Sequence, residues 1–119
     1  MANSLKQIGE FEEAIKCYKL ALGINPNYAD AHSNMGSILS DMGDFDASIQ
    51  SFDNALKIQP NHANLFNKIG LAYRMFGNFE KAIINYQLAL KLRPDYPEAL
   101  NNLAIAECDK GELEKAIIN

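Results

Sequence analysis

A single interval of 34 residues organises this chain. Gly9, Gly43, Gly77 and Gly111 each stand 34 residues from the next. A fixed period of this size indicates one supersecondary unit repeated in tandem, because each copy buries its apolar face against the next. A stack of repeats presents a long surface rather than a reactive cleft, so the interval favours a binding function.

Further sets of positions keep the same interval, and each set, called a column below, holds one kind of side chain. Because independent columns share one register, coincidence is excluded. The columns are proline at Pro26, Pro60 and Pro94; aromatic at Phe11, Phe45 and Phe79 with Leu113 in the fourth copy; aromatic at Tyr18, Phe52 and Tyr86; and small at Ala14, Ser48, Ala82 and Ala116, at Ala21, Ala55 and Ala89, and at Gly36, Gly70 and Ala104.

Each period is predicted to form two helices, because apolar residues recur at spacings of three and four. The first helices are expected over Ala29–Met42 and Ala63–Phe76, and the second over Phe45–Ile58 and Phe79–Leu92. The small columns let the two helices of a pair approach closely, and the aromatic columns are expected in the core.

The ends of these helices carry recognisable signals. Gly43 and Gly77 follow the first helices and adopt a left-handed conformation at low cost. Asp44 and Asn78 then supply side chains suited to the N-cap of the second helix. Proline disfavours helix in the residue before it, so Pro60 and Pro94 end the second helices.

The third copy resembles the tetratricopeptide repeat, and the second copy resembles it less completely. The matching residues of the third copy are Phe66, Ile69, Gly70, Tyr73, Gly77, Ala82, Tyr86, Ala89 and Pro94. Those of the second copy are His32, Met35, Gly36, Leu39, Gly43, Ser48, Phe52, Ala55 and Pro60. The resemblance implies an all-α fold, a right-handed superhelical solenoid of antiparallel helix pairs, and it covers the whole chain.

The register divides the chain into one array, residues 1–119, of four copies. Residues 29–62 and 63–96 are full repeats, whereas 1–28 and 97–119 are partial repeats. A short final helix is expected from Glu112 to Asn119, carrying Leu113, Ala116, Ile117 and Ile118. Both ends would then expose apolar edges, which predicts self-association by head-to-tail stacking or by exchange of terminal helices, with a dimer slightly favoured.

Composition agrees with one soluble domain. The chain has 119 residues, of which 48% are hydrophobic. No apolar run approaches the about 18 residues of a membrane span, and the N-terminus lacks the apolar stretch of a signal peptide. A net charge of −4 with only 11 Lys and Arg argues against nucleic acid, helical-repeat RNA readers included. A cytoplasmic protein is expected, without membrane attachment.

No set of residues predicts catalysis, a metal or a cofactor. Cys17 and Cys108 lie in different repeats, and as buried or half-buried free thiols they would suit a reducing compartment. His32 is expected to pack between helices, and His62 lies in an inter-repeat turn. The acidic run Asp41, Asp44 and Asp46 fits capping and solvated surface better than a calcium loop.

The binding surface is therefore sought by geometry, on the concave face lined by the first helices. The residues predicted to contact an extended peptide are Asn34 and Ser37 in the second copy, Asn67, Lys68, Leu71 and Arg74 in the third, and Asn101 and Asn102 in the fourth. Ser33, Asp41, Ile105 and Asp109 share this face.

One row of this face, Asn34, Lys68 and Asn102, occupies the same phase in successive repeats. An amide donates and accepts hydrogen bonds, so such a row suits a peptide backbone. It resembles the asparagine ladder of superhelical tetratricopeptide domains, with Lys68 as an interruption. Asn34 and Lys68 also match the carboxylate clamp of the family, but Asn64 and Ser4 depart from its cation and amide positions.

These features predict a non-catalytic scaffold that binds a protein or peptide partner in the concave groove. Two alternatives stay open. The array is the arm of a larger enzyme, such as a glycosyltransferase, or it is a structural array that assembles with itself into a homo-oligomer.

Overall fold

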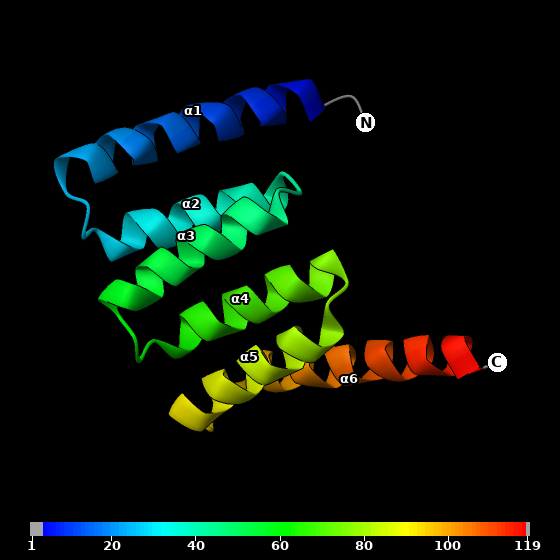
Figure 1. Cartoon of the computed structure of the whole chain (residues 1–119). Coiled ribbons are helices and arrows are strands. Elements are labelled where there is room, and N and C mark those ends of the chain that lie inside the picture. The colour runs from blue at the N-terminus through cyan, green and yellow to red at the C-terminus, as the bar shows by residue number, and fades with distance from the viewer. Residues whose placement is uncertain (1–3, 119) are drawn as a thin grey trace. The chain divides into compact units, whose positions relative to one another are not determined.

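The computed structural model describes residues 4–118, which form six α-helices and contain no strand (Figure 1). The helices are α1 (Ser4–Ile24), α2 (Ala29–Asp41), α3 (Phe45–Ile58), α4 (Ala63–Phe76), α5 (Phe79–Leu92) and α6 (Pro97–Ile118). The four middle helices lie where the 34-residue register predicts them, to within one residue. The expected all-α fold of helix pairs is confirmed, whereas its superhelical handedness stays a prediction.

Left-handed glycines and polar caps form the two turns within the middle pairs, as the sequence predicts. Gly43 has φ 86° and Gly77 has φ 100°. The Asp44 carboxylate accepts a hydrogen bond from the Ala47 backbone N–H at 3.4 Å, and the Asn78 amide oxygen accepts one from the Lys81 N–H. Each cap satisfies a backbone donor that has no partner within its own helix.

The outer two helices run straight through the corresponding glycines. The prediction of a separate short helix from Glu112 to Asn119 is wrong, because α6 continues through Gly111 to Ile118. In the same way α1 continues through Gly9. Glu10 and Glu112 follow these glycines where Asp44 and Asn78 follow the others. Glutamate is a good helix former and a poor N-cap, so nothing local favours a turn.

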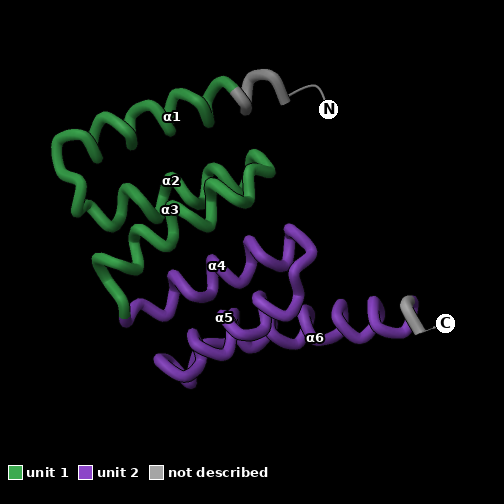
Figure 2. Tube along the Cα trace, in the orientation of Figure 1, with its two compact units in different colours: residues 1–60 green, residues 61–119 purple. Residues whose placement is uncertain are grey.

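The chain divides into two compact units, residues 1–60 and 61–119 (Figure 2). In the first unit α2 packs against both α1 and α3, and in the second α5 packs against both α4 and α6. The division into one array of four repeats stays a prediction.

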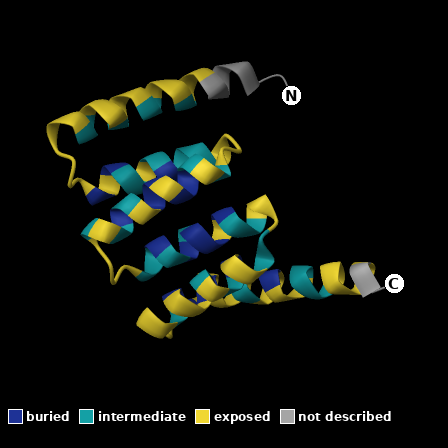
Figure 3. Cartoon of the chain, viewed as in Figure 1, coloured by how far each residue is buried: buried dark blue, intermediate teal, exposed yellow. Residues whose placement is uncertain are grey.

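The core of each unit forms where an aromatic ring packs over a glycine. A Cβ added to Gly36 would lie 2.8 Å from the Phe52 ring, and one added to Gly70 would lie 2.7 Å from the Tyr86 ring. Phe52 is 2% exposed and Tyr86 is fully buried. Figure 3 shows buried residues, in dark blue, along α2, α3 and α4. The small columns therefore do what the sequence predicts, since any larger side chain would separate the helices.

Both cysteines are free and exposed, so the expectation of buried or half-buried thiols is wrong. On α6 the reason is its orientation: Ala106 is buried, and Cys108 lies about 200° further around the helix. No helix within residues 4–118 is long and apolar enough to cross a membrane.

Candidate functional site

The second unit brings six of the predicted binding residues onto two neighbouring helices. We call this surface the α4–α6 face. It consists of Asn67, Lys68, Leu71 and Arg74 on α4, with Asn101 and Asn102 on α6. The two helices touch directly, and polar side chains of the face make the connection.

An amide network holds one end of the α4–α6 face. Asn102 Nδ2 donates to Asn67 Oδ1 at 3.1 Å, which joins α6 to α4. Asn64 Nδ2 donates to the Tyr96 hydroxyl at 3.0 Å, and Asn67 Nδ2 points at the same oxygen at 3.5 Å. Arg93 stacks its guanidinium over the Tyr96 ring, 4.8 Å from the centroid. The side chains of Arg93 and Tyr96, on either side of Pro94, are thus held in place.

The asparagines of the α4–α6 face differ in their exposure to solvent. Asn67 is only 4% exposed, so its side chain serves mainly to orient Asn102. Asn101 is exposed, and Asn102 and Lys68 are half-buried. Asn102 uses one N–H in its bond to Asn67, which leaves its other N–H and its carbonyl oxygen for an external group.

An ion pair holds the other end of the face. Arg74 Nη1 lies 3.5 Å from Asp109 Oδ2, and both side chains are partly exposed. Beneath it lies the fully buried Tyr86, whose hydroxyl has no hydrogen bond of good geometry within the described residues. Burial raises the pKa of the Tyr86 hydroxyl and the nearby Arg74 guanidinium opposes that rise, so Tyr86 is a neutral phenol at neutral pH. Between the two ends, Leu71 and Ile105 are partly exposed and supply apolar surface.

The remaining two predicted residues lie on α2, in the first unit. Asn34 is exposed and Ser37 is half-buried. The row of Asn34, Lys68 and Asn102 across successive repeats stays a prediction.

Sequence reasoning missed Tyr96, which accepts hydrogen bonds from two amides of α4. A signal was present, because Tyr28 stands 68 residues before Tyr96 in the same column, with His62 between them. His62 and Tyr28 occupy the N-cap positions of α4 and α2, without a side-chain cap bond. The column therefore marks the residue directly before each of the helices α2, α4 and α6.

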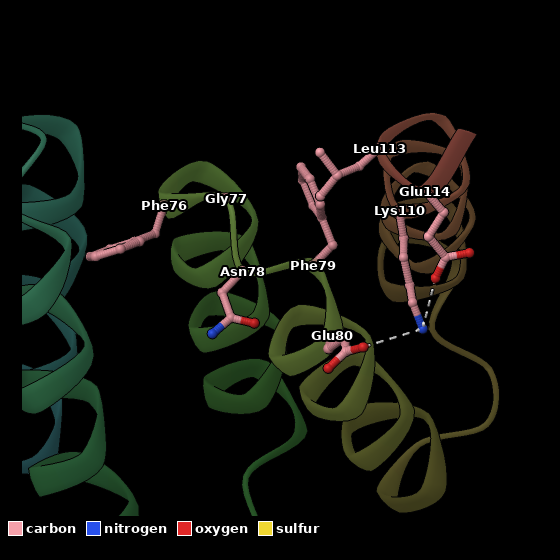
Figure 4. Close-up of a pocket in the computed structure, with 8 residues that line it drawn as sticks. All are labelled: Phe76, Gly77, Asn78, Phe79, Glu80, Lys110, Leu113 and Glu114. Atoms are coloured by element: carbon pink, nitrogen blue, oxygen red, sulfur yellow. Dashed lines mark ion pairs between the residues drawn. The ribbon is translucent and has the colours of Figure 1, made fainter. Parts of the chain in front are cut away.

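A hollow of about 480 Å³ lies away from the α4–α6 face, beside the α4–α5 turn (Figure 4). Phe79 and Leu113 line it, and its charged rim is paired within the chain, since Lys110 Nζ lies 3.8 Å from both Glu80 and Glu114. No group of three or more His, Cys, Asp or Glu residues in the described part of the chain is placed to hold a metal ion.

Comparison with protein families places the chain in the tetratricopeptide repeat family. A profile of the tetratricopeptide repeat matches residues 27–95, which is more than half of the chain. Further profiles of the same repeat match residues 2–43 and 85–118. The chain therefore belongs to this family, as its columns suggested. No curated protein matches the chain significantly.

Solved structures share the fold over nearly the whole chain. The crystal structure of MamA is 26% identical, with a TM-score of 0.80, over 98% of this chain and 68% of that one. The first tetratricopeptide domain of Spaghetti (RPAP3), bound to the HSP90 peptide SRMEEVD, is 22% identical, with a TM-score of 0.81, over 92% of this chain and 86% of that one. At these identities the likeness concerns the fold.

Proposed function

We propose that the chain is a non-catalytic protein-interaction module that binds an extended peptide on the α4–α6 face. The observation that carries the proposal is Asn102, which Asn67 holds in place while leaving it a free N–H and a carbonyl oxygen. An extended peptide offers one N–H and one C=O at each residue, so a fixed amide pairs with its backbone whatever its side chains.

The surroundings of Asn102 suit such a ligand. Lys68 adds a positive charge and Leu71, 37% exposed, adds apolar surface for a side chain of the peptide. Because Asn67 and Asn102 are already oriented by their mutual bond, little side-chain freedom is lost on binding. A protein of the same fold holds a peptide, which supports this class of ligand.

The ligand we propose is recognised by its backbone rather than by an acidic C-terminus. The position where the family's carboxylate clamp has a second cation holds Asn64, and Asn64 is bonded to the Tyr96 hydroxyl. Lys68 alone supplies one of the two cations of that clamp. The proposal therefore favours an internal extended segment of a partner protein.

The test is selection of peptides from a display library of random heptapeptides, followed by calorimetry with the selected sequences. SRMEEVD serves as the acidic-tail probe. Asn102→Ala should weaken binding of the selected peptides about 5- to 150-fold, corresponding to about 1–3 kcal/mol, because it leaves backbone groups of the peptide unpaired. Asn85→Ala is the matched control, since Asn85 lies on α5 and bonds to the Lys81 carbonyl of its own helix.

Circular dichroism should show unchanged helicity in both variants. Affinities that fall equally in both variants, or in neither, would remove the α4–α6 face as the binding site. Tight binding of SRMEEVD that depends on its free C-terminus would replace backbone recognition with a clamp. If the library yields no binder at all, the proposed function fails.

A further inference from the structure

The two units contain complementary halves of a helix pair. We call α2, α4 and α6 first-type helices and α1, α3 and α5 second-type helices, according to their place in the 34-residue register. The first unit has the order second, first, second, and the other unit has the order first, second, first. Each unit therefore ends in one helix whose pair partner is not in that unit.

The first-type helix α6 has an uncovered face. Ala104 belongs to the same column as Gly36 and Gly70, which are buried under the rings of Phe52 and Tyr86. Ala104 itself is exposed, and one turn away Leu100 is 51% exposed. This face of α6 has the shape of a surface that receives a second-type helix.

A hollow of about 350 Å³ adjoins this face of α6. It is lined by Ile83 and Gln87 of α5 and by Glu107, Lys110, Gly111 and Glu114 of α6. The first unit has a corresponding hollow, lined by the residues that stand 68 positions earlier than three of these, Ile15, Lys19 and Leu39. There a second-type helix, α3, forms the remaining wall through Ala47, Gln50 and Ser51. The first unit thus shows which kind of helix belongs beside α6.

The second-type helix α1 has the uncovered face that matches. Its column residues are only half-buried, although their equivalents in α3 and α5 are at most 2% exposed. The half-buried residues are Ala14, Tyr18 and Ala21, and their buried equivalents are Ser48, Phe52 and Ala55 in α3 and Ala82, Tyr86 and Ala89 in α5.

We propose that α1 of a second copy of this chain packs on α6, which joins copies head to tail. Tyr18 of one copy would cover Ala104 of the other, as Tyr86 covers Gly70. The two helices would run antiparallel, as the helices of each middle pair do. Gly43 and Gly77 lie between the two helices of the middle pairs, so Gly9 and Gly111, which belong to the same column, would lie opposite each other. Ala104 carries a Cβ that Gly70 lacks, so the two helices of this pair are spaced more widely than α4 and α5.

Because α1 and α6 are continuous helices, this arrangement is favoured over an α6 that folds back on itself and over a contact between two α6 helices. Since α6 does not turn at Gly111, its own residues 112–116 cannot fold back over Ala104. Leu113 lies about 200° around the helix from Gly111, and Gly111 shares a helix face with Ala104. A second straight α6 helix therefore cannot cover both Ala104 and Leu113. A straight α1 of one copy, by contrast, can lie beside a straight α6 of another copy along the whole length of both helices. The contact joins two different surfaces of the chain, so each added copy leaves one surface of each kind free. Copies are therefore added until a ring closes, or they continue into a filament.

The test is a disulfide between Ala14→Cys and Ala104→Cys in the full chain, with Cys17→Ser and Cys108→Ser. The equivalent positions touch in the α4–α5 pair, where a Cβ on Gly70 would lie 3.1 Å from the Ala82 carbonyl oxygen. Mild oxidation should yield a ladder of dimers and larger species on a non-reducing gel. Lys16→Cys with Ala104→Cys is the matched control, because Lys16 lies about 200° around α1 from Ala14 and should give no ladder.

A disulfide that forms within single chains, leaving only monomer on the gel, would overturn the proposal. So would the absence of any disulfide, or equal ladders in the pair and its control.

Sedimentation across a concentration series gives a second readout. The unmodified chain should gain mean mass with concentration, and Ala104→Glu should raise the concentration needed at least tenfold. Ala104 is exposed, so this change leaves the fold and the circular dichroism spectrum intact. A chain that is monomeric throughout, or an Ala104→Glu variant that assembles equally well, contradicts the proposal.

Discussion

The contact between Gly70 and the Tyr86 ring limits how closely α4 and α5 pack. The ring occupies the space where any other residue at position 70 would place its Cβ, and the Ala82 carbonyl oxygen closes the site from another side. Gly36 and Phe52 repeat the arrangement in the first unit, where Ser48 Oγ also donates to the Gly36 carbonyl at 2.6 Å. A small residue in one helix thus permits a buried aromatic in its partner.

Gly70→Ala should lower the free energy of unfolding by about 1–3 kcal/mol, because the added methyl overpacks the site. Gly36→Ala should cost less, since the three atoms nearest to its methyl all belong to the Phe52 ring, whereas the methyl of Gly70→Ala lies close to a backbone oxygen as well. Urea denaturation of both variants measures the difference. A Gly70→Ala variant as stable as the parent would show that the helix pair adjusts its spacing freely.

The Tyr86 hydroxyl predicts an unusual tolerance. It is buried without a hydrogen bond of good geometry to any described residue, so Tyr86→Phe should leave stability unchanged or raise it by up to about 1 kcal/mol. Tyr86→Ala should instead lower it by about 3–5 kcal/mol, because a buried ring is lost. Thermal denaturation of both variants is the measurement. A clear loss in Tyr86→Phe would mean that the hydroxyl bonds to Arg74 strongly enough to stabilise the unit.

At the scale of the element, the residue after each glycine separates the turns from the continuous helices. Asp44 and Asn78 cap the helix that follows them, and the preceding glycines take positive φ. Glu10 and Glu112 offer no such cap, and the chain stays helical. Glycine permits the left-handed conformation but does not impose it. The cap and the packing of the returning helix decide.

The same substitution should therefore have opposite effects at two glycines of one column. Gly77→Ala should lower stability by about 1–2 kcal/mol, because φ is 100° there and an L side chain strains that conformation. Gly111→Ala should raise the stability of α6 by about 1 kcal/mol, since nothing lies within 4 Å of its added Cβ and alanine favours helix. Chemical denaturation followed by circular dichroism distinguishes the two. A destabilised Gly111→Ala would indicate that α6 breaks at this residue in solution.

At the scale of the whole molecule, each helix contacts mainly its sequence neighbours within its own unit. The helix contacts of each unit join consecutive helices, with the addition of α4 and α6. Stability in such a fold is approximately a sum of terms from each repeat and from its contacts with its neighbours. The columns therefore define the fold, while the binding that we propose depends on residues outside them, such as Asn102 and Lys68.

The sequence by itself determined the family, the helix type and the bounds of α2, α3, α4 and α5. These follow from local physics: apolar spacing, glycines with positive φ, polar caps and prolines act within a few residues of each other. The columns also identified the glycine–aromatic pairs, because a 34-residue period places equivalent contacts in register. The same phase argument selects the predicted binding residues on α4 and α6, whose role in binding stays a prediction.

Only the tertiary structure showed which of those polar residues face each other. Asn67 is buried and Asn102 is oriented by it, although both are asparagines on the predicted face. The Tyr96 hydroxyl accepts hydrogen bonds from Asn64 and Asn67, which its 34-residue column, shared with Tyr28 and His62, does not reveal. The course of α1 and α6 through their glycines was also missed, because a helix ends where a cap and a returning partner together outweigh continued hydrogen bonding. Such a balance depends on contacts between segments far apart in the chain, and these exist only once the helices have packed.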